Sequence, residues 1–301
     1  MILCCGEALI DMLPRETTAG ENAFAPHAGG SVFNTAVALG RLGAPVQFFS
    51  GLSSDLFGDM LRAQLAASDV DSGPAAISDR PTTLAFVTLT DGHASYAFYD
   101  ENTAGRMLSE GDLPDTDADA LFFGGISLVV EPCGAAYEAM MVREASTRLT
   151  MIDPNIRPSF ITDEAAYRTR LTRMMGVADI IKTSDEDLEW IVGDADANAL
   201  LTSTGAQVIL LTRGGDGVSI VTANGTYDVA AEKADVVDTV GAGDTFSAGF
   251  MAQLHKSGHL TKGGIKHATE TDLRAAAAFG AKVAAITVSR AGANPPWASE
   301  L

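Results

Sequence analysis

The chain has 301 residues, 47% of them hydrophobic, and 39 acidic against 20 basic residues give it a formal net charge of −19. This length fits one large α/β domain with a small addition, and the charge disfavours partners such as nucleic acid or anionic membranes. No apolar run approaches the roughly 18 residues that span a bilayer, and the N-terminus lacks the basic segment of a signal peptide, so we expect a cytoplasmic protein.

The first predicted element is a buried strand over residues 2–10, apolar but broken by Glu7. It would deliver Asp11 at its carboxyl end, which is where ligands bind in open parallel sheets. Asp11 is therefore a candidate ligand-binding residue, and an ordinary strand-terminating aspartate is the alternative. Residues 12–27 are irregular and predict a strand pair or flap that leaves the main body.

A glycine pair then precedes a predicted helix. Residues 28–43 read AGGSVFNTAVALGRLG, with apolar residues at helical spacing after the glycines. Asn34 falls in the first turn, where its amide can point at whatever Gly29 and Gly30 approach. The alternative is a plain glycine turn before a core helix, with Asn34 in solvent.

A hairpin interrupts the alternation of strands and helices that follows. Segments 82–90 and 93–99 have strand character and flank Asp91 and Gly92, a strong hairpin-turn signal. Because a hairpin inside a parallel alternation suggests a separate small sheet, we assign it, together with residues 12–27, to a lid over the site.

Beyond the hairpin, the chain returns to buried strands and helices. Strands are predicted at 121–123 and 149–152, on either side of a helix from about 132 to 148. The second strand runs into DPNIRP at 153–158, where prolines block a helix and hold polar groups at the end of the strand. Arg157 is a candidate anion ligand there, or else a surface arginine paired with nearby carboxylates.

Two more predicted strands end in polar or glycine-rich segments. The strand at 178–182 leads into an acidic helix that Ser184 helps to begin, and the strand at 208–212 leads into RGGDG at 213–217. Because another strand and no helix follows these glycines, they are not a dinucleotide fingerprint, and a Rossmann dehydrogenase is disfavoured. An alanine-rich helix is predicted over about 271–288.

The stretch 238–246 organises the rest of the chain: it reads DTVGAGDTF and opens a helix. Gly241 and Gly243 lack a Cβ, so their backbone can turn successive N–H groups toward one point at a helix N-terminus, which is an arrangement that binds phosphate. Asp244 sits where a hydroxyl could approach a bound γ-phosphoryl group, which suits phosphoryl transfer. The alternative is a loop followed by an N-capping aspartate.

The two glycine signatures resemble those of the ribokinase-like (PfkB) sugar kinase family. The likeness covers nearly the whole chain and is closest to bacterial fructokinases, which strings such as GEALID at 6–11 and DPNIRP at 153–158 also resemble. It implies a ribokinase-like α/β fold, a mostly parallel sheet flanked by helices on both faces. One domain over 1–301 would include a β-sheet lid formed by about 12–28 and 82–106.

The resemblance also implies roles for single residues. Asp244 would be the catalytic base, beside an anion hole formed by Gly241, Ala242 and Gly243. Sugar or phosphate contacts would come from Asp11, Gly30, Asn34, Phe98, Arg106 and Arg157. The nucleotide would be bordered by Lys182, Ser184, Thr212, Gly214, Gly217 and Ala281. Asp187 would support Mg²⁺, carried with ATP, through water, and Asp238 would join a monovalent-cation site for K⁺.

The chain departs from the commoner family pattern at two places. Many relatives have Asn-x-x-Glu where this chain has Ser184 to Asp187, which shortens the carboxylate and replaces the amide. Ala281 stands where ribokinases have an asparagine near the adenine, so base recognition would rest on apolar contact.

These features predict an ATP-dependent kinase that phosphorylates a primary hydroxyl of a small sugar, with fructose the expected substrate. One alternative is a kinase for 2-keto-3-deoxygluconate or a related sugar acid, whose carboxylate could pair with Arg157. An alternative of another class is a non-catalytic sugar-binding sensor. The apolar hairpin faces, which a lone two-stranded ribbon could not bury, predict a homodimer through the lid.

Overall fold

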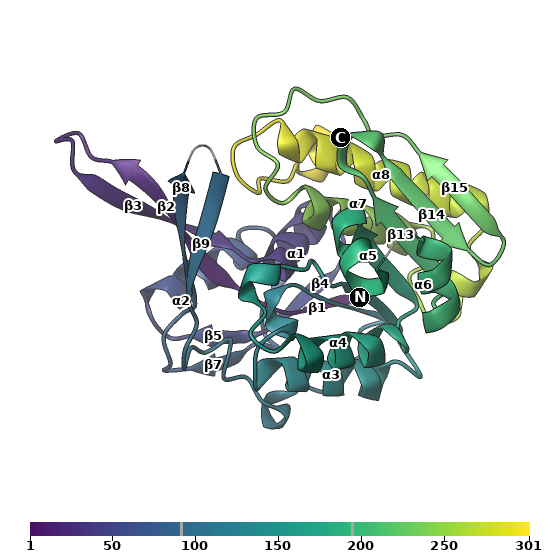
Figure 1. The fold of residues 1–301 in the computed structure, drawn as a ribbon, viewed down its shortest axis with the longest axis horizontal. Coiled ribbons are helices and arrows are strands. Elements are labelled where there is room, and N and C mark those ends of the chain that lie inside the picture. The colour runs from purple at the N-terminus through teal and green to yellow at the C-terminus, as the bar shows by residue number, and fades with distance from the viewer. Residues whose placement is uncertain (91–92, 194–195) are drawn as a thin grey trace.

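The computed structural model describes residues 1–90, 93–193 and 196–301, and a nine-stranded sheet forms the centre of that part of the chain (Figure 1). From one edge to the other its strands are β15 (Gly225–Val229), β14 (Val218–Thr222), β13 (Val208–Thr212), β12 (Ile180–Ser184), β11 (Leu149–Asp153), β10 (Ala120–Gly124), β1 (Ile2–Cys5), β4 (Val46–Phe49) and β6 (Val70–Asp71). Neighbours from β13 to β6 are parallel, while β14 and β15 add antiparallel strands at one edge.

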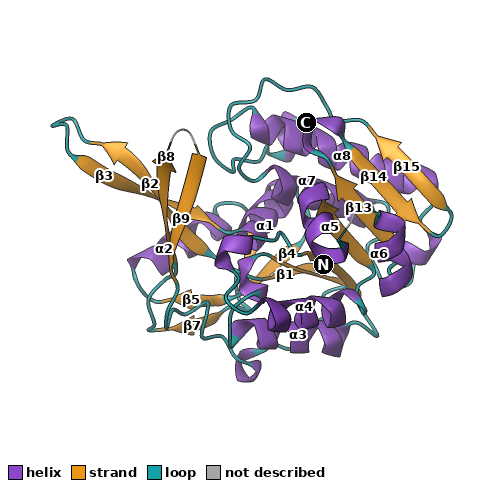
Figure 2. Ribbon diagram, viewed as in Figure 1, coloured by secondary structure: helices purple, strands orange, loops and turns teal. Residues whose placement is uncertain are grey.

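Helices cover both faces of this sheet (Figure 2). Because strand side chains alternate between faces, Cys4 and Phe122 point into one core while Leu3 and Phe123 point into the other. The first core is covered by α1 (Ser31–Arg41), α2 (Leu56–Ala66), α7 (Ala242–Lys256) and α8 (Glu270–Val288). The second is covered by α3 (Cys133–Glu144), α4 (Glu164–Met175), α5 (Asp185–Val192) and α6 (Ala197–Thr204). The predicted fold class is confirmed.

A four-stranded sheet projects from the main body and is called the lid sheet below (Figure 1). Its strands, in spatial order, are β3 (Asn22–Gly29), β2 (Leu9–Glu16), β8 (Leu84–Thr90) and β9 (His93–Tyr99). The two inner strands pair in parallel and the outer pairs are antiparallel. The strand pair and the hairpin expected from the sequence therefore join in one sheet, while the predicted turn at Asp91 and Gly92 lies outside the described residues. A short parallel ribbon, β5 (Gly51–Ser53) with β7 (Ala76–Ser78), lies apart from both sheets.

The first predicted strand is wrong in its extent. The chain leaves the main sheet after β1 and enters the lid sheet at Leu9, so Asp11 lies inside a lid strand and not at the end of a core strand. The chain changes from one sheet to the other at Gly6, where its backbone passes close to α1. A Cβ at this position would lie 2.4 Å from the side chain of Val32, so the close passage requires glycine. The next residue, Glu7, is only 9% exposed. Its carboxylate accepts hydrogen bonds from the backbone N–H groups of Ser31 and Ser127, which belong to two other segments. Glu7, the acidic residue within the apolar run over residues 2–10, was the feature of the sequence that indicated this change of sheet.

Within residues 1–90, 93–193 and 196–301, no helix is both long and apolar enough to cross a membrane.

Candidate active site

The candidate base Asp244 lies where α1 and α7 begin. α7 starts at Ala242, after Gly241 has taken the left-handed backbone (φ 78°) that glycine adopts without strain. The Asp244 side chain does not cap its own helix. Its Oδ1 accepts a hydrogen bond of 2.7 Å from Ser31 Oγ, and its Oδ2 accepts one of 2.9 Å from Asn34 Nδ2. The two alternatives, an N-capping aspartate and an asparagine in solvent, are therefore both wrong.

The two glycines before Asp244 serve different purposes, contrary to the expectation that both need unusual backbone angles. Gly241 has a positive φ, whereas Gly243 is the second residue of α7 and is not among the glycines with a positive φ. A Cβ on Gly243 would instead lie 2.9 Å from Lys182 Nζ. Glycine is thus required at 243 for space and at 241 for conformation.

Unpaired backbone N–H groups are available at this helix start. The N–H of Ala242 makes a hydrogen bond of 3.3 Å to Thr239 O in the preceding loop. The N–H groups of Gly243 and Asp244 have no acceptor within hydrogen-bonding distance among the described residues. First-turn N–H groups together with the helix dipole favour a bound anion, so the start of α7 can hold a phosphate group.

A buried ion pair lies beside the helix start. Lys182, in the middle of β12, is 5% exposed, and its Nζ donates to Asp153 Oδ2 at 2.8 Å. Burial alone would lower the pKa of Lys182, but the charge and hydrogen bond of Asp153 raise it, so the ammonium stays charged. Asp187 adds a third carboxylate near Lys182, besides Asp153 and Asp244, and burial raises the pKa of Asp187. The cation thus offsets the repulsion among three acidic groups.

These acidic residues are candidate ligands of a divalent metal ion. In the described part of the chain, no group of three or more histidine, cysteine, aspartate or glutamate side chains is arranged to hold a metal ion. Mg²⁺ often binds through one or two carboxylates, several waters and substrate phosphates, so the residues suit a cation that arrives with a nucleotide. Asp153, whose buried Oδ1 has no hydrogen-bond partner among the described residues, and Asp187 are the carboxylates able to support it through water. Asp187 also accepts the N–H of Ile156 at 3.0 Å.

Asp238 joins two loops that border the start of α7. Its Oδ1 accepts the N–H of Val240 at 3.0 Å, and its Oδ2 accepts the N–H of Gly292 at 2.9 Å. The segment before the helix is therefore fastened to the loop that follows Arg290.

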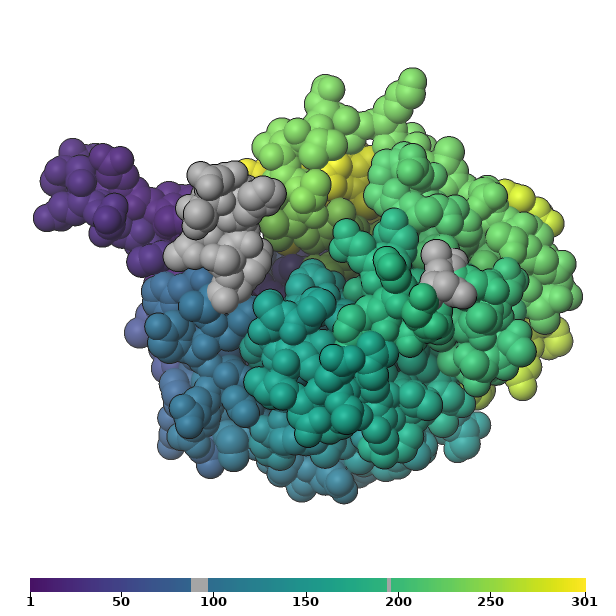
Figure 3. All heavy atoms as spheres, viewed as in Figure 1, coloured from purple at the N-terminus to yellow at the C-terminus, as the bar shows by residue number. Residues whose placement is uncertain are grey.

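The lid sheet brings Asp11 next to the glycine pair at 29 and 30. A Cβ on Gly29 would lie 2.2 Å from Asp11 Oδ2, and Gly30 has φ 109° with Glu7 O only 2.9 Å from where its Cβ would be. Asp11 has no side-chain hydrogen bond among the described residues, and burial raises its pKa to about 6. Figure 3 shows the surface hollowed beside the lid sheet, where the purple of α1 and the yellow-green of α7 appear at the floor.

The predicted arginine ligands lie differently from each other. Arg106 Nη1 donates to both carboxylate oxygens of Asp100, at 3.1 Å each, and Arg106 faces a small cavity of about 30 Å³ that Glu7 and Phe160 also line. Arg157 is exposed, donates to the carbonyl oxygen of Ile156, and has no carboxylate partner in the described part of the chain. The surface ion pair suggested for it is therefore wrong.

Phe98 and the nucleotide-side residues lie on separate elements. The Phe98 ring packs edge-on against Phe160 at 4.7 Å.

The residues expected to border the nucleotide lie at the ends of strands and on helices. Thr212 ends β13 and donates to Thr183 O at 3.3 Å, and Gly214 begins the turn that leads to β14. The predicted turn at 213–217 has a positive φ at two glycines, Gly214 (49°) and Gly217 (93°), and Ala281 lies partly buried on α8. Ser184 caps α5 by accepting the N–H of Asp187.

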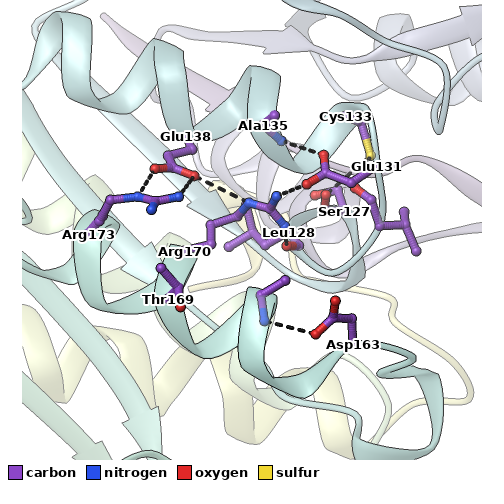
Figure 4. Close-up of polar contacts among 12 residues, drawn as sticks. Ser127, Leu128, Glu131, Cys133, Ala135, Glu138, Asp163, Thr169, Arg170 and Arg173 are labelled. Carbon is purple, nitrogen blue, oxygen red and sulfur yellow. Dashed lines mark hydrogen bonds and ion pairs between the residues drawn. The ribbon is translucent and has the colours of Figure 1, made fainter.

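Arg170, a buried arginine of α4, binds the turn at residues 127–131, beside the small cavity that Arg106 faces (Figure 4). Arg170 donates to Leu128 O at 2.8 Å and pairs with Glu131 and, at 3.5 Å, with Glu138. Ser127, in the same turn, donates its backbone N–H to Glu7 Oε2 at 3.3 Å. Because Glu7 binds both this turn and the first residue of α1, the helices of the second core help to fix the position of the start of α1.

Sequence reasoning did not assign roles to Glu7, Ser31, Asp153 or Arg170. Ser31 lies in the glycine motif at 28–43 and Asp153 begins the motif at 153–158. A polar residue at the first position of a helix and an aspartate at the end of a strand could both have been proposed as site residues. Glu7 was noticed only as a break in a strand. For Arg170 the sequence around α4 held no motif that pointed to it.

The chain is similar to known proteins over nearly its whole length. Residues 1–300 match the description "pfkB family carbohydrate kinase". A fructokinase from Rhizobium leguminosarum bv. trifolii is 53% identical over 279 residues, which cover 91% of this chain and 86% of that protein. Probable fructokinase-2 from Arabidopsis thaliana is 32% identical, with 98% and 92% covered.

Solved structures show the same fold. A Xylella fastidiosa fructokinase with bound ATP has a TM-score of 0.88 and 30% identity, covering 97% of this chain and 93% of that one. The aminoimidazole riboside kinase of Salmonella enterica, solved with aminoimidazole riboside and an ATP analogue, has a TM-score of 0.84 at 23% identity over 97% and 94%. The second likeness concerns the fold alone.

Proposed function

This chain belongs to the pfkB family of carbohydrate kinases, and from that membership we propose that it transfers the γ-phosphoryl group of ATP to a primary hydroxyl of fructose. The observation that carries the proposal is Asp244, held by Ser31 and Asn34 at the start of α7 beside N–H groups that can bind phosphate. The 53% identity to a fructokinase over most of both chains supports the choice of sugar. A non-catalytic sensor would have no use for the intact base and anion hole.

In the proposed reaction, Asp244 accepts the proton of the primary hydroxyl as that oxygen attacks the γ-phosphorus and the bond to the ADP oxygen breaks. Backbone N–H groups of the predicted anion hole at Gly241, Ala242 and Gly243 would meet the negative charge on the transferred group, and the N–H of Ala242 would give up its 3.3 Å hydrogen bond to Thr239 O to do so. Lys182 adds a fixed positive charge next to Gly243. Mg²⁺ carried with ATP would supply further positive charge on the phosphates, and Asp187 would support it through water.

We propose that the sugar binds on the face of the lid sheet that carries Asp11. Asp11 and Asn34 would bind neutral hydroxyls, with Gly30 leaving room for the sugar to approach. Phe98 and Arg106 would border the site less directly, because Arg106 is already paired with Asp100. A site built to hydrogen-bond hydroxyls rejects analogues that lack them.

Nucleotide and cation contacts complete the proposal. Lys182 and Ser184, with Thr212, Gly214, Gly217 and Ala281 on neighbouring elements, would border ATP. A K⁺ ion near Asp238 would order the loop before α7, which that side chain already fastens to Gly292.

The choice between fructose and a sugar acid can be decided at Arg157. We expect fructose to give a higher kcat/KM than 2-keto-3-deoxygluconate, and we expect Arg157→Ala to leave that order unchanged, because this exposed guanidinium is not needed to bind neutral hydroxyls. A coupled ADP-release assay with both sugars on both proteins measures this. A higher kcat/KM for the acid in the wild type, lost selectively in Arg157→Ala, would replace fructose by a sugar acid.

A homodimer through the lid is also proposed. On the face of the lid sheet opposite Asp11, Phe24 packs edge-on against Phe86 at 5.0 Å, and Phe86 against Tyr99 at 5.3 Å. Phe24 is 43% exposed and Tyr99 63%, so this aromatic row lacks a cover in the single chain. Apolar surface of this kind is buried favourably against a second copy.

We therefore expect light scattering at micromolar concentration to give the mass of a dimer, and Phe24→Lys to give mostly monomer. Thr18→Lys, at the exposed turn of the same strand pair, is the matched control and should remain dimeric. A wild-type protein that is monomeric under these conditions contradicts the proposed dimer.

A further inference from the structure

Ser31 is in direct contact with the candidate base, although nothing in its motif assigned it a role. It is the first residue of α1, and its Oγ donates to Asp244 Oδ1 at 2.7 Å. Asn34, one turn along the same helix, holds the other oxygen at 2.9 Å. The carboxylate is therefore held on both sides by groups of one helix, with Ser31 at the end of that helix nearest the glycine pair.

The backbone of Ser31 is fixed by a carboxylate of its own. Its N–H donates to Glu7 Oε1 at 2.8 Å, and the other Glu7 oxygen accepts the N–H of Ser127. The Glu7 carboxylate also packs against Gly125 (φ 71°), where a Cβ would lie only 2.1 Å from Glu7 Oε1. A contact between α1 and α7, from Thr35 Oγ1 to Asp244 O at 3.2 Å, fixes the other partner. The main chain of both Ser31 and Asp244 is thus held by a side chain of another residue, Glu7 in the first case and Thr35 in the second.

This arrangement leaves the base able to act. An ionised carboxylate offers about four lone-pair positions, and the two hydrogen bonds to Asp244 use two of them. The remaining positions can accept a sugar hydroxyl while Ser31 and Asn34 stay in place. Removing the Ser31 hydroxyl would free the carboxylate to rotate about its χ2 bond, held by Asn34 alone, and orientation to within a fraction of an ångström is what an effective base requires.

Resting on the proposed kinase function, we propose that Ser31 is a positioning residue whose hydroxyl holds the Asp244 carboxylate in the orientation that receives the sugar proton. The same bond stabilises the ionised carboxylate, because only the charged form accepts it fully. Burial raises the pKa of Asp244, the hydrogen bonds from Asn34 and Ser31 lower it, Asp153 on β11 raises it and Lys182 on β12 lowers it. Loss of the Ser31 hydroxyl must therefore move the pKa of Asp244 upward.

The test is Ser31→Ala, assayed for sugar-dependent ADP release across pH. We expect kcat on the pH plateau to fall by about 10-fold to 100-fold, the range for a hydrogen bond to a charged group. KM for fructose and for ATP should stay within about twofold, since a positioning residue binds neither substrate. The acid limb of the kcat profile should move to higher pH, and Ser31→Thr, which keeps a hydroxyl, should restore both. Ser257→Ala, at the far end of α7, should match the wild type.

Each other outcome overturns the inference in a different way. Wild-type kcat and an unmoved acid limb in Ser31→Ala would show that the hydroxyl does not position the base. A raised KM for fructose with unchanged kcat would make Ser31 a sugar ligand instead. A Ser31→Thr variant as slow as Ser31→Ala would assign the loss to packing. Absence of sugar-dependent ADP release by the wild-type protein would overturn the proposed function itself, and this inference with it.

Discussion

Replacing Asp244 by alanine is expected to lower kcat by about 10²-fold to 10⁴-fold, the usual contribution of a general base. The carboxylate is the group that Ser31 and Asn34 hold against the start of α7, and the variant leaves both of those side chains without an acceptor for their hydrogen bonds. Nucleotide binding should persist, because the backbone N–H groups at the helix start remain.

The measurement is kcat from ADP release with fructose, combined with titration of ATP by calorimetry. Asp235→Ala removes an exposed carboxylate from the segment before the same helix and should behave as the wild type. A near-wild-type kcat in Asp244→Ala would remove Asp244 from the mechanism, and loss of ATP binding together with kcat would point to a damaged helix start.

The second large effect is expected from Gly243→Val, which should lower kcat by about 10³-fold, the size of a lost anion-hole contact. A Cβ at this position would lie 2.9 Å from Lys182 Nζ, whose ammonium is fixed by Asp153 at 2.8 Å. Because that ion pair is buried, the lysine cannot give way without breaking it, and the added methyl groups would occupy the approach of the phosphate.

Thermal unfolding monitored by circular dichroism should accompany the Gly243→Val assay, since only a folded variant tests the site. Gln253→Val, a β-branched residue placed near the other end of α7, is the matched control for helix propensity and should retain activity. A folded Gly243→Val variant with normal turnover would show that the start of α7 does not bind the transferred phosphoryl group.

The parts of the site that could be predicted are those encoded in short, continuous strings. The stretch 238–246 and the glycine pair before α1 are short motifs, so Asp244, Asn34 and Gly241 could be picked as candidates from them, and the family resemblance gave those candidates their roles. The fold class followed from alternating strands and helices, because parallel neighbours need a crossover between them. The lid hairpin was visible as a break in that alternation.

The parts that could not be predicted depend on contacts between distant residues. The pair Lys182 and Asp153 joins two strands, and the reason for glycine at 243 appears only when that lysine is in place. Glu7 illustrates the same limit, since a single polar residue in an apolar run does not say which N–H groups it will bind. The helix α4 was overlooked although Asp163 caps its start and Tyr167 and Leu171 have helical spacing, because no functional string drew attention to it.

Sugar-dependent ADP release by the wild-type protein tests the central claim most directly. With Mg²⁺, ATP and fructose, the account predicts ADP formation well above the rate without sugar, and a product in which a primary hydroxyl of fructose carries the phosphate, identified by phosphorus and carbon NMR. No ADP above the sugar-free rate with fructose, while another class of acceptor is phosphorylated or none is, would contradict it.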